Sequence, residues 1–286
     1  MRDACVADLS GSGRAGRLRD RVLTHSVLVV AAALMVIPFG WELLTSLKTQ
    51  THASEVPPTL VPDGQWSNYS SVFRLVPFGR QFLNTVLMTA GRTAGQLVLC
   101  SLAAYAFSRL RFPGRKVIFG VLLSVLMVPP QLFLIPQYQI MVDLHWLNTL
   151  QALVVPGMFS AFGIFVLRQF FASLPNELFD AARIDGAGPV RIFWSIALPL
   201  IRPGVSALAI LTIIWSWNDL MWPLVVNTNP SKMTLSVGLA SLQGQFQTNY
   251  PVLMAGSLLA SIPLVLVFVA LQKQFVQGIA FTGSKG

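Results

Sequence analysis

Long apolar stretches recur along this chain, and each is long enough to cross a lipid bilayer as a helix. We count six, at roughly 26–44, 82–107, 117–135, 150–172, 199–226 and 253–272. Backbone groups inside a bilayer must be hydrogen-bonded within the protein, which favours helices. The sequence therefore predicts an all-α, polytopic membrane protein with six transmembrane helices. Several spans contain prolines, among them Pro129, Pro130, Pro156 and Pro263, which a helix bundle can tolerate.

Composition and charge agree with a membrane protein. The chain is 54% hydrophobic and only 11% charged, whereas soluble domains carry about 25% charged residues. A net charge of +9 could suggest nucleic acid, but the basic residues are scattered around the apolar stretches. Segments 1–25, 108–116, 173–198 and 273–286 hold 13 Lys and Arg, whereas 45–81, 136–149 and 227–252 hold 4. The positive-inside rule then predicts that both termini are cytoplasmic.

The domain organisation is expected to be simple. Residues 1–25 are read as a basic cytoplasmic tail, and residues 26–286 as one transmembrane domain. The tail contains a GxGxxG pattern at 11–16, but neither a preceding strand nor a βαβ unit accompanies it, so we do not predict a nucleotide site there. A signal peptide is the alternative for the first stretch, but Trp41 and Glu42 follow it in place of a small-residue cleavage site.

Catalytic and metal-binding patterns are absent from the sequence. It contains no Walker A, HExxH or GxSxG motif, and its cysteines are Cys5 and Cys100, with no metal-ligand spacing. We therefore expect neither an enzyme nor a cofactor site. Such a membrane protein either uses an ion gradient, which requires ionisable residues within the bilayer, or borrows ATP hydrolysis from a partner. Arg92 and Asp219 are the main candidates for the first route.

The segment 174–203 is unusually charged for its place between two apolar stretches. Asn176 can cap a helix, and Gly186 can supply the left-handed residue that ends one. Pro189 suits the first turn of a second short helix, and Pro199 marks a break before the next span. These residues predict a helical hairpin at the cytoplasmic membrane surface.

One face of the first short helix has the features of a docking surface. Leu178, Ala181, Ala182 and Asp185 fall at i, i+3, i+4 and i+7, which gives a slim face with an acidic end. Such a face suits a groove on another protein. The alternative is an amphipathic loop lying on lipid, for which more Lys and Arg would be expected.

A second candidate site lies in the fifth span. Trp215, Asn218, Asp219 and Trp222 are spaced to share one helix face, and indole, amide and carboxylate groups suit the apolar faces and hydroxyls of a sugar. Two other interpretations stay open. Tryptophans near the membrane surface commonly form an aromatic belt, and Asp219 can simply pair with Arg92. Arg92 lies in a small-xxx-small pattern at 91–95 and must face the bundle interior or water.

Several motifs together resemble a known family. DAARIDG at 180–186 followed by IALP at 196–199 resembles the EAA loop of ABC-importer permeases, although the family has glutamate where this chain has Asp180. The segments AAYAFSRL at 103–110, WSWND at 215–219 and QFVQG at 274–278 also resemble the carbohydrate-uptake branch, near its maltose-type second permease subunit. The resemblance covers nearly the whole chain beyond residue 20.

The resemblance implies a fold, partners and functional residues. The fold would be that of a type I ABC importer permease with cytoplasmic coupling helices, in a bacterial or archaeal cytoplasmic membrane. The chain would import sugar with a second permease, for which the resemblance favours a different chain, two ATPase subunits that bind ATP and Mg²⁺, and an extracytoplasmic binding protein. Residues implied to contact or couple to the ATPase are Glu177, Leu178, Asp180, Ala181, Ala182, Asp185, Gly186 and Pro199.

Two alternatives to a sugar permease are carried forward. A permease of the same superfamily could carry another solute, such as a peptide or a glycerol phosphodiester. A polytopic enzyme or secondary transporter is the alternative from another class, and it would need buried clusters of His, Asp or Glu.

Overall fold

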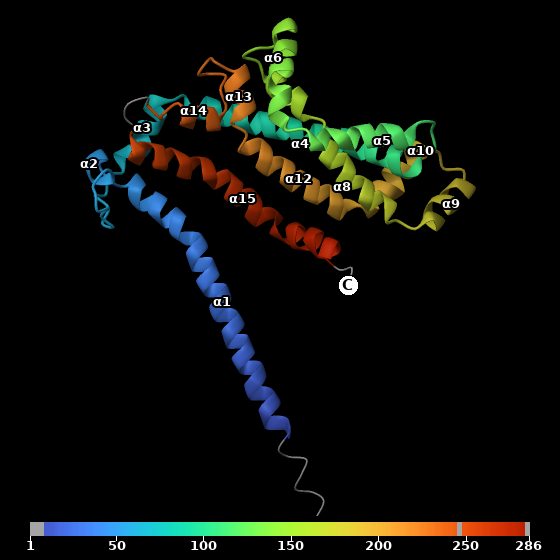
Figure 1. Ribbon diagram of the computed structural model, residues 1–286, viewed down its shortest axis with the longest axis horizontal. Helices are drawn as coiled ribbons and strands as arrows, with labels where there is room; N and C mark the ends of the chain where they lie inside the picture. Colours follow the sequence, from blue (N-terminus) through green and yellow to red (C-terminus); the bar gives the residue numbers. More distant parts are fainter. Residues whose placement is uncertain (1–8, 245–247, 284–286) are drawn as a thin grey trace, which may run out of the picture. The chain divides into compact units, whose positions relative to one another are not determined.

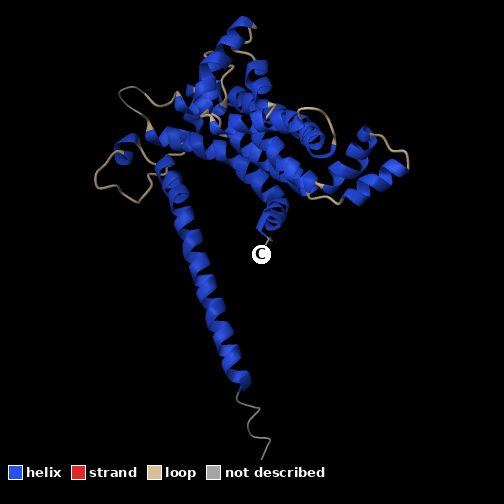
Figure 2. Ribbon diagram, turned by 45° about the vertical axis from the view of Figure 1, so that its right-hand side comes forward, coloured by secondary structure: helices blue, strands red, loops and turns tan. Residues whose placement is uncertain are grey.

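Helices make up the whole of the regular structure. The computed structural model describes the backbone of residues 9–244 and 248–283, and the side chains of residues 21–244 and 248–272. Within those ranges it contains helices and no strand (Figure 2). The predicted all-α class is confirmed. Residues 1–8 of the expected tail, with Cys5, lie outside the described ranges.

The chain forms two compact units, which we describe separately. The first comprises the chain up to Ser70 together with Asn249–Leu258. Its long helix α1 (Leu9–Ser46) already begins inside the segment assigned to the basic tail, and α2 (Gln50–Ala53) follows it. Asn68, in the first turn of α3 (Ser67–Leu75), donates hydrogen bonds to the carbonyls of Ser46 and Lys48 at 2.8 and 2.9 Å.

The second unit comprises Ser71–Thr248 and the chain from Leu259 onward. Its longest helix, α4, is continuous over 32 residues (Figure 1). The helical segments from there to the end of the chain are α4 (Phe78–Arg109), α5 (Arg115–Ser124), η1 (Val125–Met127), η2 (Pro130–Phe133), α6 (Leu134–Asp143), α7 (Leu150–Val154), η3 (Val155–Gly157), α8 (Ala161–Ala172), α9 (Asn176–Ile184), α10 (Pro189–Ile192), η4 (Phe193–Ala197), α11 (Leu198–Leu200), α12 (Arg202–Trp217), α13 (Met221–Val226), α14 (Leu235–Ala240) and α15 (Tyr250–Gly283).

The core of the second unit lies where α4 packs against α8 and α12. Small residues permit this close approach. A Cβ added to Gly204 of α12 would lie 2.5 Å from the ring of Phe170 on α8. Toward one end of the unit the core becomes aromatic, because Tyr105 of α4 packs on Phe171 and Phe193 with ring centroids 5.6 and 5.2 Å apart. The 174–203 segment packs against this aromatic cluster through its buried residues.

The expected count of six spans is confirmed if each bent pair of helices is one span. Three helices are long and apolar enough to cross a bilayer by themselves, namely Arg21–Ser46, Phe78–Arg109 and Tyr250–Gln272. The other three spans are broken. Their halves, Arg115–Met127 with Pro130–Asp143, Leu150–Gly157 with Ala161–Ala172, and Pro189–Leu200 with Arg202–Trp217, meet at bends of 102°, 41° and 77°.

Candidate functional sites: an exposed hairpin and a polar recess

The 174–203 segment forms the predicted helical hairpin. Helix α9 ends at Ile184, and Gly186 follows the C-cap residue Asp185 with a φ of +77°, in the left-handed region. The Gly186 amide donates to the Arg183 carbonyl at 3.0 Å and the Ala187 amide to the Ala182 carbonyl at 2.9 Å. These are the two hydrogen bonds of a Schellman motif, for which glycine is the preferred residue. Pro189 then opens α10, as expected.

Two details of the predicted hairpin are wrong. Asn176 does not cap α9, because Pro175 occupies the cap position and Asn176 accepts a hydrogen bond from Arg109. Ala182 does not share the exposed face, because it is 7% exposed and packs inward beside Phe179. The spacing that groups Ala182 with Leu178 also places it one turn from Phe179, and the large aromatic residue decides which face is buried.

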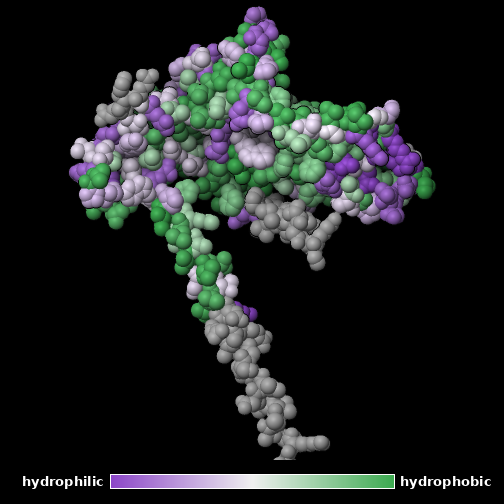
Figure 3. All heavy atoms as spheres, in the orientation of Figure 1, coloured by the Kyte–Doolittle hydropathy of each residue, from purple (hydrophilic) through white to green (hydrophobic). Residues whose placement is uncertain are grey.

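The outward face of α9 carries the other predicted docking residues. Glu177, Leu178, Asp180, Ala181 and Asp185 are all exposed. Asp180 forms an ion pair with Arg183 at 2.9 Å on this surface. Figure 3 shows hydrophilic side chains gathered over the end of the unit that holds α9.

Large apolar side chains are interspersed with these charges. Ile184 is 86% exposed, Val190 71% and Trp194 54%. Exposed apolar groups with a polar rim are typical of surfaces that bind another macromolecule.

Pro199 lies at a corner and not on this surface. The helix widens into a π-helical turn at Phe193–Ala197, continues through α11 and breaks at Ile201, where the path turns by 77°. Proline lacks the amide that would complete the helical ladder, so a bend near it is expected. Ile201 itself is buried. Pro199 therefore helps set the angle between the two halves of the fifth span, of which Pro189–Leu200 includes α10 of the hairpin and Arg202–Trp217 is α12.

A polar recess of about 230 Å³ lies between α4, η3 and the end of α12. Its lining residues are Arg92, Gln96, Gly157, Thr212, Trp215, Ser216 and Asp219. Arg92 donates from Nη1 to Asp219 at 2.7 Å and from Nε to the Leu153 carbonyl at 2.7 Å. Gln96 lies one turn further along α4, where it donates to the Gly157 carbonyl at 2.9 Å and accepts from Thr212 at 2.8 Å.

The prediction that four residues share one helix face is wrong. Helix α12 ends at Trp217, and Asn218 turns its side-chain amide back to the Ile214 carbonyl at 2.8 Å. Trp222 belongs to α13, is buried, and donates from its indole nitrogen to the Ala152 carbonyl at 2.8 Å. Of the five residues expected to line the solute pathway, the recess brings together Arg92, Trp215 and Asp219. Trp215 is 52% exposed and packs edge-on against Phe162.

Gln96, Thr212 and Ser216 were not predicted to belong to this site. The signal for Gln96 was its spacing of four residues from Arg92, which places both on one face of α4. Cys100 continues that face, and its thiol lies 3.5 Å from the Ser160 carbonyl. Arg92, Gln96 and Cys100 are thus spaced at i, i+4 and i+8, and each donates to a backbone carbonyl of the broken fourth span. Those carbonyls need hydrogen-bond partners inside a membrane.

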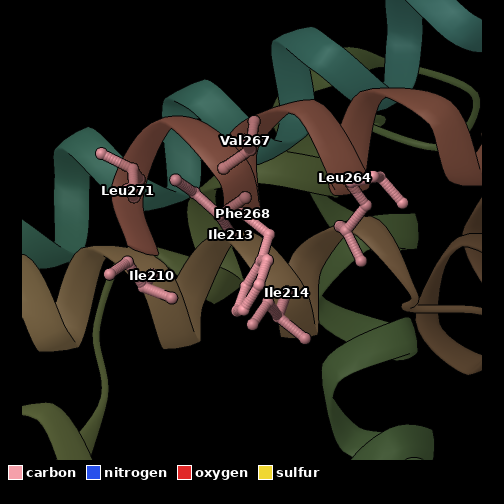
Figure 4. A pocket seen from close by; sticks show the side chains of 8 residues that line it. Ile210, Ile213, Ile214, Leu264, Val267, Phe268 and Leu271 are labelled. Atoms are coloured by element: carbon pink, nitrogen blue, oxygen red, sulfur yellow. The ribbon is translucent and has the colours of Figure 1, made fainter. Parts of the chain in front are cut away.

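A second cavity, of about 220 Å³, is apolar and lies between α12 and α15 (Figure 4). Its walls come from Ile210, Ile213 and Ile214 of α12 and from residues 264–271 of α15. No polar group lines it, so it offers nothing to orient a hydroxylated solute. Among the side chains that the structure describes, no three His, Cys, Asp or Glu residues are grouped as a metal would require.

The multi-span helical fold, the exposed hairpin and the polar recess together define a membrane transport subunit. Residues 96–281 match the family of binding-protein-dependent transport system inner membrane components. The sn-glycerol-3-phosphate transport system permease proteins UgpE of Yersinia enterocolitica and Salmonella typhi are each 33% identical, over 267 and 268 residues, 90% of this chain and 95% of theirs. The chain therefore belongs to this family of ABC-importer permeases.

A solved structure has the same fold. It is a bacterial ABC transporter involved in the import of the acidic polysaccharide alginate, matched with a TM-score of 0.77 at 23% identity over 91% of this chain and 97% of that one.

Proposed function

We propose that this chain is one permease subunit of an ATP-driven importer of a sugar or a similar polyhydroxylated solute. Its relatives' names include a glycerol phosphate transporter and an alginate importer, both of which handle polyhydroxylated compounds. The observation that carries the proposal is the α9–α10 hairpin. Its turn is fixed by the left-handed Gly186, and its outer surface exposes acidic and apolar side chains. A chain without a nucleotide-binding motif needs such a surface to bind an ATPase, so that ATP hydrolysis by the partner can drive its conformational change.

The proposed complex contains this chain, a second and different permease, two ATPase subunits that bind ATP and Mg²⁺, and an extracytoplasmic binding protein. The hairpin would face the cytoplasm together with both termini, as the 13 Lys and Arg in the four segments on that side, against 4 on the other, favour. No step of ATP hydrolysis would take place on this chain. Closure of the ATPases would move the hairpin and, through it, the membrane helices.

Gly186→Val tests this coupling. Valine is strained at a φ of +77°, although, apart from the two neighbouring residues, no heavy atom that the structure describes lies within 4 Å of where its Cβ would be. A sugar that stimulates ATP hydrolysis by the reconstituted complex is first identified by screening. With that sugar, we expect Gly186→Val to reduce uptake at least about tenfold while ATP hydrolysis continues.

Gly188→Ala is the matched control. Gly188 lies two residues away with an ordinary φ of −72° and equally open surroundings, so uptake should be unchanged. Normal uptake by Gly186→Val at equal expression would refute the coupling role.

We further propose that the polar recess forms part of the solute pathway. Trp215 offers an apolar ring face and Asp219 retains some exposure, with 22% of its side chain accessible. Asp219→Asn and Trp215→Ala should each weaken the apparent affinity for the transported sugar, because hydrogen bonding and stacking are reduced. An unchanged half-saturating sugar concentration in both variants would remove the recess from the pathway.

A further inference from the structure

Arg109, the last residue of α4, ties that helix to the hairpin. Its guanidinium donates to the carbonyls of Phe171 and Leu174, the latter at 2.6 Å, and to the Asn176 side chain at 2.5 Å. It also lies over the ring of Phe179 at 4.1 Å. The planar guanidinium has five N–H donors, so one side chain can hold the end of α8 and the start of α9 together.

A second contact joins α4 to the other half of the hairpin. Tyr105 lies one turn before Arg109, on the same face of α4, and its hydroxyl donates to the Pro189 carbonyl at 3.3 Å. The buried side of α9 packs into the same aromatic cluster, because Phe179 and Ala182 join Tyr105 and Phe171 in one core. A displacement of the hairpin would therefore break these contacts or move the end of α4 with it.

The opposite end of α4 is fastened to the connection between α13 and α14, residues 227–234. Asn84 donates to the carbonyls of Ser231 and Met233 at 3.0 and 2.9 Å, and Gln81 donates to the Pro230 carbonyl at 3.2 Å. Thr85 accepts from the first amide of α14 at 2.8 Å. A Cβ on Gly238 of α14 would collide with Gln81, so the two helices are in close contact here.

Between these two ends α4 is unbroken, as Figure 1 shows. At 1.5 Å per residue its length is about 48 Å, more than the thickness of the hydrocarbon core of a bilayer. The third, fourth and fifth spans are bent at their breaks, and a break can absorb a displacement at its hinge. Of the spans that lie wholly in this unit, α4 is the one able to carry a displacement along its whole length.

We propose that α4 is the rod that carries motion of the α9–α10 hairpin to the 227–234 connection, and that Arg109 is the positioning residue joining the rod to the hairpin. This inference rests on the proposed function, since an ATPase must supply the motion. The helix that transmits the motion would be α4, and the side chain that connects it to the hairpin would be Arg109. ATP binding would then change the environment of the 227–234 connection through Arg109.

The experiment places a reporter on that connection. Lys232 is exposed, so Lys232→Cys can carry a spin label in the full importer, in a background where Cys5 and Cys100 are replaced by serine. The probe is ATP with vanadate, which needs no knowledge of the solute. With Arg109 present we expect the nucleotide to change the label's mobility. In Arg109→Ala the nucleotide-dependent change should fall at least about fivefold, the lower range of usual coupling.

Arg111→Ala is the matched control, because Arg111 is a basic residue two positions away and exposed; it should respond as the unaltered protein does. Arg109→Lys keeps the positive charge and the alkyl chain but loses the planar guanidinium with its several donors. This variant tests the role of Arg109 if Arg109→Ala does not assemble into the importer. A full response in Arg109→Lys, or in an assembled Arg109→Ala, would overturn the proposal.

Failure of the proposed function looks different. In that case no ATPase would co-purify with the unaltered protein, and its label would not respond to nucleotide.

Discussion

At the scale of single residues, polar side chains act here mainly by satisfying backbone groups that the fold leaves open. Arg92 and Gln96 hold carbonyls of the broken fourth span, and Arg109 holds the carbonyl of Phe171 in the last turn of α8 and that of Leu174 beyond it. In lipid an unpaired carbonyl costs several kcal/mol, so Arg92 and Gln96 stabilise a bend in the fourth span that the membrane would otherwise penalise. The Arg92–Asp219 pair also shows why a charge inside a membrane need not be a proton relay. The pairing considered from the sequence is the one present.

The interaction between His52 and Asp63 is expected to depend on pH. Its Nδ1 lies 2.6 Å from Asp63, and the hydrogen bond and charge of Asp63, with a smaller contribution from Glu55, raise the pKa of His52 above its ordinary value of 6.5. The pKa of Asp63 is lowered from 3.8, first by the backbone amide of Thr49 and then by the hydrogen bond to His52.

These shifts have opposite signs and define one pH window. The contribution of His52 is complete below pH 6.5 and is lost as the pH rises through its raised pKa. The contribution of Asp63 is present above pH 3.8 and is lost as the pH falls through its lowered pKa. The ion pair between His52 and Asp63 should therefore be strongest in mildly acidic medium, where His52 is protonated and Asp63 is ionised.

NMR titration of the labelled histidines tests this window, with His25→Gln and His145→Gln to assign the signals. His52 should titrate above 6.5, and Asp63→Asn should bring its pKa back toward that value. A value at or below 6.5 in the unaltered protein would contradict the geometry.

At the scale of elements, periodicity and composition predicted where helices would be but not where they would break. Prolines at 129–130, 156 and 199 were visible, yet a transmembrane helix can contain proline without breaking, as α1 does at Pro38 and α15 at Pro263. Whether a break occurs depends on partners for the freed carbonyls. Those partners, such as Arg92 for Leu153, lie some sixty residues away in sequence.

The same long-range dependence explains the misplaced residues. The spacing of Trp215 and Trp222 assumed that one helix continues, but α12 ends at Trp217, and Trp222 packs into a separate core with Met88 and Leu153. By contrast, the Gly186 turn and Pro189 were predicted correctly, because a left-handed glycine and a proline at N1 depend on local chemistry alone. Local signals identified the hairpin, whereas the recess required tertiary contacts.

At the scale of the whole molecule, the chain is a permease subunit, and in the proposed function its membrane helices move in response to an ATPase partner. Its family was inferred from the EAA-like motif and is confirmed by the match over residues 96–281. Many apolar side chains remain exposed along its helices, for example Met35 of α1 at 74% and Ile135 of α6 at 81%. Such surfaces are covered by lipid or by other subunits in an assembled importer.

The proposed coupling requires an ATPase to bind the outward face of α9. Photo-cross-linking in the intact membrane tests it most directly, with a photoreactive amino acid placed at Ala181 or at Ile184, which is 86% exposed. The matched control is Met127, equally exposed at 86% but in the third span. We expect a covalent adduct with an ATP-hydrolysing subunit from Ala181 and Ile184, and none from Met127. Absence of that adduct from both α9 positions, in a membrane where the subunits are expressed together, would show that the ATPase does not bind this face.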